Sequence, residues 1–380
     1  MTLVRPEPQA AEPLAARVRG EAVVYRLYDV GYEIRLDQAF ERLAASGPER
    51  PRPVRGEAQA IQIPNPPVTV RLGAESVTIA GQPVAAEMSA RLFDFGVVSL
   101  RARVATPPDA PWREFAAFGA AVGAAPGWAE VFARTRAQLL ARIAPAIVKP
   151  GESPVTEDYV VFRVHALADA AGGRLTAECL RDEEIVGLLT GESRPLAAAA
   201  RRELLSQRFA YFEDDLAVLA WNAALVVEPV AQDTDVQYVL EFANAQLLEL
   251  RFYDAVLDAE LPNIHARTAE ARRGPHLLGG GFSRLLATLQ ARVADATELV
   301  ERVENALRVT DDVFLARIYA AALEIFRGRA WRSGIERKIA IVRDTYEMLN
   351  AESQARRAEA LEFVIIVLIV LELALAVLRR

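Results

Sequence analysis

The C-terminal end of the chain carries the feature that most limits how it can fold. Residues 361–378 read LEFVIIVLIVLELALAVL, in which only Glu362 and Glu372 are charged. A helix extended back to Ala358 would be about 31 Å long, which matches a hydrocarbon core about 30 Å thick. The apolar residues together gain several kcal/mol on insertion, more than the roughly 2.5–3.5 kcal/mol that one acidic group costs. We therefore predict a transmembrane helix at 358–380, anchored through Leu361, Glu362, Phe363, Ile365, Ile366, Leu368 and Glu372.

The placement of this helix in a cell rests on weaker signals. Arginines flank both of its ends, at 356–357 and 379–380, so arginine counts do not decide its orientation. The first thirty residues contain no apolar stretch long enough for a signal peptide. We expect a single-pass membrane protein with most of its chain in the cytosol and the lipid bilayer as a partner. A helix buried in a core or at a subunit interface is the alternative, although a helix apolar on all faces favours a membrane.

Composition excludes some functions. A net charge of -7 argues against a dedicated nucleic-acid binder, because such proteins usually carry a basic surface. The single cysteine, Cys179, excludes an intrachain disulfide and a cysteine-based metal site within one chain. The chain lacks a P-loop and the GxGxxG, GxSxG and HExxH motifs. The sequence therefore predicts no catalytic residues, no cofactor and no metal site.

The rest of the chain predicts an α+β body followed by an antiparallel helical bundle or coiled coil. Residues 1–20 are a disordered lead-in, and strand-like segments occur at 22–30, 68–72, 76–81, 90–104, 158–167 and 208–229. Turn residues at 213–215 and at 222 separate the last of these into hairpins. Helices are expected at Leu36–Ala45, from about Trp112 to Ile147, and at roughly 175–190 and 194–205. We place boundaries at 21–150, 151–230, 231–357 and 358–380.

Residues 232–352 read almost entirely as helix, with breaks expected at Pro262, at 274–275, at 279–281 and at 328–334. Two heptad seams indicate helix packing and a homo-oligomer. A capping box, Ser333 with Glu336, predicts the start of the last polar helix. The first seam comprises Leu286, Leu289, Val293, Ala296, Val300, Val303 and Leu307, and the second comprises Ile335, Ile339, Val342, Tyr346 and Leu349.

Three groups of polar residues are weak candidates for a site. The histidines, His165, His265 and His276, have no second metal ligand at helical or hairpin spacing, so structural or surface roles are favoured. The acidic runs 182–184 and 213–215 are best explained as a solvated helix face and a solvated turn. A basic segment, Arg327, Arg329, Arg332, Arg337 and Lys338, is a candidate contact for RNA or an acidic protein, with a solvated turn as the favoured alternative.

The segment from Val309 to Leu378, with VTDDVFLARIYAAALEIF and RRAEALEFVIIVLIVLELAL, resembles the C-terminal signature of a family of unknown function that includes the required-for-meiotic-nuclear-division proteins. The segment YFEDDLAVLAWNAALVVEP is similar to a strand pair of that family. The resemblance implies a bacterial or organellar membrane protein, with mitochondrial relatives that support translation at the inner membrane. It implies no enzymatic activity.

These observations favour a non-enzymatic, membrane-anchored scaffold or tether that oligomerises through its helical region and presents the α+β body to a cytosolic protein partner. Two alternatives stay open. The α+β body could be an enzyme or a metabolite-binding module, which a pocket lined by polar groups would favour. The chain could also be a translation-linked factor that contacts RNA or a ribosome, which salt-dependent association would favour.

Overall fold

The computed structural model describes residues 16–49, 65–151, 153–192, 194–229, 234–273 and 313–378, together with positions 287, 290, 291, 294 and 297. The chain forms two compact units. The first comprises Met1–Glu249 and Ala306–Arg327, and the second comprises Leu250–Asn305 and Gly328–Arg380.

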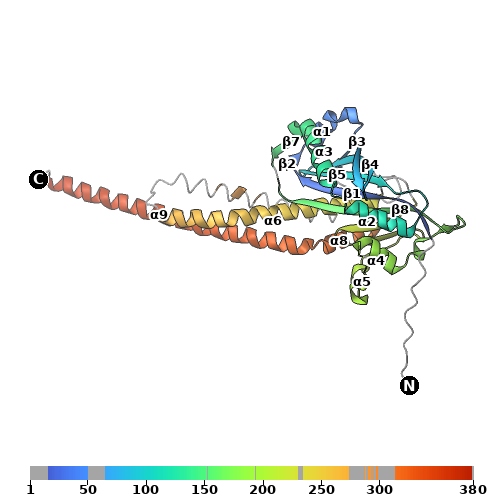
Figure 1. Ribbon diagram of the computed structural model, residues 1–380. Helices are drawn as coiled ribbons and strands as arrows, with labels where there is room; N and C mark the ends of the chain where they lie inside the picture. The colour runs from blue at the N-terminus through green and yellow to red at the C-terminus, as the bar shows by residue number, and fades with distance from the viewer. Residues whose placement is uncertain are drawn as a thin grey trace, which may run out of the picture. The chain divides into compact units, whose positions relative to one another are not determined.

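A mixed sheet forms the centre of the first unit, with strand order β10-β11-β12-β8-β1-β5-β4-β3 (Figure 1). β12 runs parallel to β8, and the other described pairs in this order are antiparallel. The strands are β1 (Arg17–Asp29), β3 (Val68–Ile79), β4 (Gln82–Leu92), β5 (Val97–Ala105), β8 (Thr156–Ala168), β10 (Arg208–Phe209), β11 (Leu216–Leu219) and β12 (Ala223–Val227). Shorter strands β6 (Ala110–Pro111) and β9 (Arg174–Leu175) extend the sheet, and β2 (Gly31–Ile34) pairs with β7 (Ile147–Pro150).

β1 is buried on both of its faces, as expected for a strand with a full ladder on each side. Because side chains alternate along a strand, Ala22, Val24 and Tyr28 point into the main hydrophobic core. Glu21 and Tyr25 point to the opposite face. At Gly20 the pairing with β8 shifts by one residue, and a Cβ atom there would lie 2.2 Å from the carbonyl oxygen of Arg163. Glycine is therefore required at this bulge.

Helices cover the apolar face of the sheet. Buried aromatic residues of α2 (Trp112–Gly123) and α3 (Trp128–Ile143), including Phe115 and Phe132, belong to the same core cluster as the strands. We predicted one helix over 112–147, and this prediction was wrong. The chain breaks at 124–127, where Pro126 lacks an N–H group and disfavours helix in the residue before it. The remaining helices formed before residue 230 are α1 (Leu36–Arg42), α4 (Asp182–Thr190) and α5 (Ala198–Leu204).

The strands predicted from sequence were largely found, and the turns at 213–215 and 222 do separate β10, β11 and β12. The predicted boundary at residue 150 falls between β7 and β8. Strands from both sides of that boundary pair directly, because β1 lies next to β8 in one sheet. A mixed α+β body is thus present.

The opposite face of the sheet carries α6 (Asp235–Arg273) and α8 (Val313–Ile325). The first turns of α6 are buried almost all round, from Val239 to Leu250. A capping box begins this helix: the Gln237 N–H donates to Thr234 Oγ1 at 3.4 Å, and the Thr234 N–H donates to Gln237 Oε1 at 3.3 Å. Tyr319 of α8 is hydrogen-bonded to Gln246 of α6, and Arg317 of α8 lies 5.8 Å from the ring of Phe209 in β10, so α8 packs beside α6 on the sheet.

In the second unit, the later part of α6 lies beside α9 (Gly328–Leu378). Leu250 and Leu257 pack with Ile335 and Ile339, and Lys338 Nζ lies 2.6 Å from a carboxylate oxygen of Asp254 and 2.6 Å from one of Asp258. Both helices point the same way along their common axis (Figure 1). The antiparallel arrangement that we predicted does not hold for these two helices.

Two predicted breaks in this region were also wrong. α6 continues through Pro262, which is exposed, so water can solvate the carbonyl that loses its hydrogen-bond donor. α9 begins at Gly328, directly after Arg327, which has a positive φ of 54°. Ser333 consequently lies inside the helix and does not cap it. Gly334 also lies inside the helix, and a Cβ there would be at an ordinary contact distance of 3.4 Å from Asp254 Oδ1.

Within the described residues, no single helix is long and apolar enough to cross a membrane. The helical segments Trp112–Gly123 and Trp128–Ala146 are bent by 59° relative to each other. Together they meet the requirements for a broken membrane span, but only in length and composition. Both of its helices contribute buried residues to the core described above.

Candidate functional site

A buried polar layer lies between the sheet and α6, and it gathers most of the buried charged groups in the described chain. On β4 and β5 arginine and serine alternate, since Arg91 pairs with Ser99 and Ser89 pairs with Arg101. This register places the two guanidinium groups diagonally on one face. The apolar residues that alternate with them, Ala90, Leu100 and Ala102, face the hydrophobic core.

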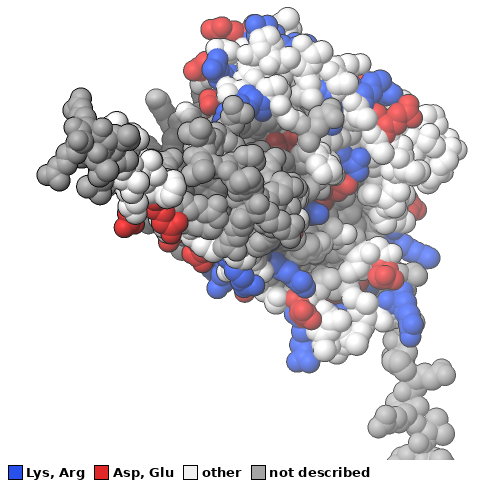
Figure 2. Space-filling view, turned by 90° about the vertical axis from the view of Figure 1, so that its left-hand side faces the viewer, with Lys and Arg blue, Asp and Glu red and all other residues white. Residues whose placement is uncertain are grey.

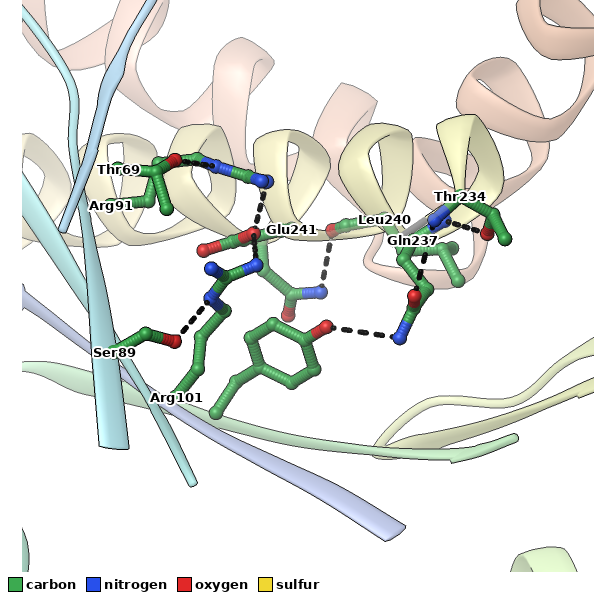
Figure 3. Close-up of polar contacts among 10 residues, drawn as sticks. Thr69, Ser89, Arg91, Arg101, Thr234, Gln237, Leu240 and Glu241 are labelled. Carbon is green, nitrogen blue, oxygen red and sulfur yellow. Dashed lines mark hydrogen bonds and ion pairs between the residues drawn. The ribbon is translucent and has the colours of Figure 1, made fainter. Parts of the chain in front are cut away.

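Glu241 of α6 is the centre of this layer (Figure 3). Its Oε2 atom accepts a hydrogen bond from Arg91 Nη1 and lies 3.9 Å from Arg101 Nη1. The side chain is fully buried, and its Oε1 atom has no hydrogen-bond partner. Each arginine is held by a strand hydroxyl as well, Arg91 Nε by Thr69 at 3.2 Å and Arg101 Nε by Ser89 at 3.1 Å. The carboxylate therefore pins α6 to two neighbouring strands.

Other polar groups of α6 continue the layer. The Gln237 amide donates to the Tyr25 hydroxyl at 3.5 Å, and the Asn244 amide donates to the Leu240 carbonyl at 2.9 Å (Figure 3). The Arg91 guanidinium also lies 4.7 Å from the centre of the Tyr238 ring, within cation–π distance. The Asn244 bond lies within α6, whereas the contacts of Gln237, Tyr238 and Glu241 with the strands fix the rotation of the helix and its position along the sheet.

A second charged group forms around Glu21 at the other end of the layer. Its Oε1 atom lies 2.6 Å from Arg163 Nη1, 3.5 Å from Arg103 Nε and 3.8 Å from His165 Nε2. Burial raises the pKa of Glu21, but the hydrogen bond with His165 and the charges of Arg103 and Arg163 outweigh it and leave the pKa below its usual value. Glu21 is thus an ionised partner of buried arginine.

Two further carboxyl groups on this side of the molecule respond differently to burial. Burial raises the pKa of Glu228. This effect outweighs a hydrogen bond with Thr234 and the charge of Arg163, both of which lower the pKa. Burial also raises the pKa of Asp29 to about 6, although its carboxylate accepts a hydrogen bond of 3.1 Å from the Gly31 N–H. The direction of the pKa shift of a buried carboxyl group here thus depends on the number of cations that it meets.

The candidate residues from sequence mostly lie elsewhere. His165 joins the Glu21 group, whereas His276 and the side chain of His265 lie outside the described residues. The acidic run 182–184 begins α4 with Asp182 and Glu183 exposed, as expected for a solvated helix face, and its carboxylates pair with Arg208, Arg201 and Arg181. No group of three His, Cys, Asp or Glu side chains suited to a metal ion occurs in the part of the chain that the structure describes.

The basic segment at 327–338 is not a loop. Arg327 precedes α9, while Arg329, Arg332, Arg337 and Lys338 lie within the first turns of that helix. Lys338 is largely buried between two aspartates, and hydrogen bonds to Asp254 and Asp258 raise its pKa despite burial, which lowers it. The prediction of a single exposed basic contact therefore fails for Lys338. On the face drawn in Figure 2, acidic and basic side chains are interspersed.

The predicted helical seams are only partly visible. Ile335, Ile339 and Val342 of the second seam are buried, the first two against α6. The side chains of Tyr346 and Leu349 lie outside the described residues, as do Leu286, Leu289, Val293, Ala296, Val300, Val303 and Leu307 of the first seam. The predicted anchor residues Leu361, Glu362, Phe363, Ile365, Ile366, Leu368 and Glu372 all lie on α9 and are exposed.

The sequence contained a signal for the polar layer that was missed. Gln237, Glu241 and Asn244 follow one another at spacings of four and three, which places them on one face of an otherwise apolar helix. On the strands, serine and arginine alternate with apolar residues, a pattern usually explained by a solvated face. Neither pattern alone shows that the two polar faces meet.

Comparison with known proteins places this unit in a family. A family model described as "Uncharacterized protein MJ0711, N-terminal domain" matches residues 19–234, more than half of the chain and the span from β1 to the cap of α6. The chain belongs to the family of the MJ0711 N-terminal domain. A curated relative, uncharacterized protein MJ0711 of Methanocaldococcus jannaschii, is 25% identical over 174 residues, or 46% of this chain and 52% of that protein. The chain thus spans about half the length of this relative. No solved structure matches.

This membership corrects the resemblance drawn from the sequence. The MJ0711 N-terminal family is identified through the sheet unit, and its matched relative is archaeal, so the assignment to a bacterial member of the required-for-meiotic-nuclear-division family was wrong. That resemblance relied mainly on Val309–Leu378, outside the matched span. Heptads and an apolar run are dictated by helix packing and insertion in many unrelated proteins, and therefore identify a family poorly.

Proposed function

We propose that this protein is a membrane-attached, non-catalytic tether that holds its sheet unit near a bilayer and presents it to a protein partner. The observation that carries the proposal is the exposure of α9 near its end. Every residue from Leu361 to Glu372 is exposed. The large apolar side chains among them are between 47% and 67% exposed.

Helix geometry makes this run unsuitable for water. Successive residues are rotated by about 100°, so a run of this length presents apolar side chains in every direction. An exposed apolar surface of that kind marks a contact with lipid or protein. A bilayer covers all sides of a helix at once, whereas a docking site covers one side. The run in the sequence continues to Leu378, past the last described side chain at Leu375.

The buried polar layer supports a structural role for the sheet unit. Arg91, Arg101 and Glu241 contact one another and the strand hydroxyl groups, and so each has a partner within the fold. The contacts hold the start of α6, and the same helix continues into the second unit. We include self-association through the helical region in the proposal, in keeping with the heptad spacing.

Alkaline carbonate extraction tests membrane attachment. The full chain should remain in the membrane pellet, and a chain ending at Asn350 should appear in the soluble fraction. The double variant Ile366→Arg, Val370→Arg should be extracted like the truncated chain, because each arginine in the centre of the run costs about 2.5–3.5 kcal/mol.

The matched control is Gln354→Arg, Ala358→Arg, which adds the same charges to exposed positions of the same helix before the run. This variant should stay in the pellet. Complete extraction of the parent chain by carbonate would contradict membrane attachment. A soluble parent that forms a discrete oligomer, and becomes monomeric on truncation, would instead identify the run as a protein interface.

A further inference from the structure

The loop between β10 and β11 presents two aromatic rings at an ordered turn. Tyr211 and Phe212 are 68% and 66% exposed. Their rings are perpendicular, with centroids 4.8 Å apart, and the Tyr211 ring lies 5.4 Å from that of Phe314. The Tyr211 N–H donates to Asp215 Oδ1 at 2.7 Å, which closes the turn. The exposed rings are therefore held in place before any partner binds.

Arginine already lies at two positions on this edge of the sheet. Arg317 lies 5.8 Å from the centre of the Phe209 ring, and Arg174 donates to Asp214 at 2.6 Å. A ring and a carboxylate next to the loop thus attract guanidinium groups, through the ring quadrupole and through charge.

The outermost members of this edge are Tyr211, Phe212 and Glu213, which we call the aromatic tip. Within the described residues no cation lies over the rings of Tyr211 or Phe212, and the adjacent Glu213 is exposed. Two exposed ring faces beside a carboxylate match a planar cation that can stack and donate hydrogen bonds at once. Arginine meets this requirement better than lysine, since its guanidinium is planar and less strongly hydrated.

We propose that the aromatic tip binds an arginine side chain of a partner protein. The charges are complementary, because the inner positions of this edge hold arginines from the chain itself and the outer position offers the same chemistry to an arginine from outside. Arginine binding by the aromatic tip does not depend on membrane attachment, because the residues of the tip all lie in the sheet unit.

Fluorescence anisotropy with the full chain in detergent micelles tests the proposal. The probe is a labelled peptide, Ala-Arg-Leu-Arg-Ala, compared with a version in which citrulline replaces both arginines and so keeps their shape without charge. The arginine peptide should bind more tightly. The double variant Tyr211→Ala, Phe212→Ala should weaken its binding by about fivefold or more, since a cation–π contact contributes about 1 kcal/mol or more when desolvated.

Two control variants distinguish this contact from non-specific binding. Val313→Ala removes an exposed apolar group near Phe314 but no ring, and Glu192→Gln removes an exposed carboxylate elsewhere in the unit. Both should leave binding of the arginine peptide unchanged, whereas Glu213→Gln should weaken it. Equal binding of the arginine and citrulline peptides would overturn the proposal, and so would equal losses from Val313→Ala and the double variant. The peptide comparison uses the parent chain, so it stands even if a variant fails to fold.

Discussion

The two faces of the central sheet are both buried, but by different chemistry. On one face, aromatic and aliphatic side chains from α2 and α3 fill the space against the strands. On the other, α6 meets arginine, glutamate, tyrosine and serine side chains that contact one another. Apolar packing is tolerant of small rotations of a helix, whereas hydrogen-bonded ion pairs hold one register. The difference indicates that the first face supplies most of the stability and the second fixes where α6 lies.

The largest effect is expected on the apolar face. Phe132→Ala should lower the free energy of unfolding by about 4 kcal/mol, because the fully buried ring leaves a cavity. Urea unfolding followed by the fluorescence of the buried Trp112 and Trp128 measures the loss. Phe212→Ala, at an exposed position, should change stability by less than about 0.5 kcal/mol. Comparable losses at the two positions would contradict the assignment of the core.

A smaller effect, which a second change reverses, is expected on the polar face. Glu241→Leu should cost about 3 kcal/mol, because it leaves buried guanidinium groups without their carboxylate. Adding Arg91→Met should restore at least half of that loss, because an apolar pair replaces a broken ion pair. The same urea unfolding curves give both values. A double variant no more stable than Glu241→Leu would show that Arg91 gains little from Glu241 and would remove the distinction between the faces.

The smallest effect depends on pH. Burial raises the pKa of Asp29 to about 6 from a usual value of 3.8, so the folded state holds this proton more tightly than the unfolded chain does. Its stabilising contribution is complete below the unfolded pKa and is lost as pH rises through about 6. Asp29→Asn, which can still accept from the Gly31 N–H, should therefore be about 2 kcal/mol more stable than the parent at pH 8. The advantage should vanish near pH 4, and an advantage independent of pH would contradict this cause.

Local signals in the sequence were sufficient for the strands and most turns of the sheet. Alternation and turn residues identified the segments around β1, β8 and β10–β12, since those signals act over a few residues. The break between α2 and α3 also had a local signal, Pro126, which was overlooked. By contrast, Pro262 and Gly334 indicated breaks, but α6 and α9 continue through them.

The polar layer could not be predicted in the same way, because it requires knowledge of which faces meet. Arg91, Arg101 and Glu241 are distant in sequence, and each alone resembles an ordinary surface charge. Their burial follows from sheet order and from the path of α6 across the strands. The aromatic tip was visible in sequence only as part of an acidic turn. The sequence alone does not show that Tyr211 and Phe212 are exposed while the nearby apolar residue Leu216 is buried.

The polar layer also affects the chain while it is being synthesised. The helices that cover the apolar face, α2, α3 and α4, are all made before residue 191, and the last strand of the sheet ends at Val227. α6 and α8 follow later. A nascent chain that has just completed the sheet can therefore have its more apolar face covered, while the uncovered face carries charged side chains of the polar layer among apolar ones such as Val23 and Leu27. Such an intermediate would be slow to aggregate during the seconds before α6 leaves the ribosome, at about 5–20 residues per second.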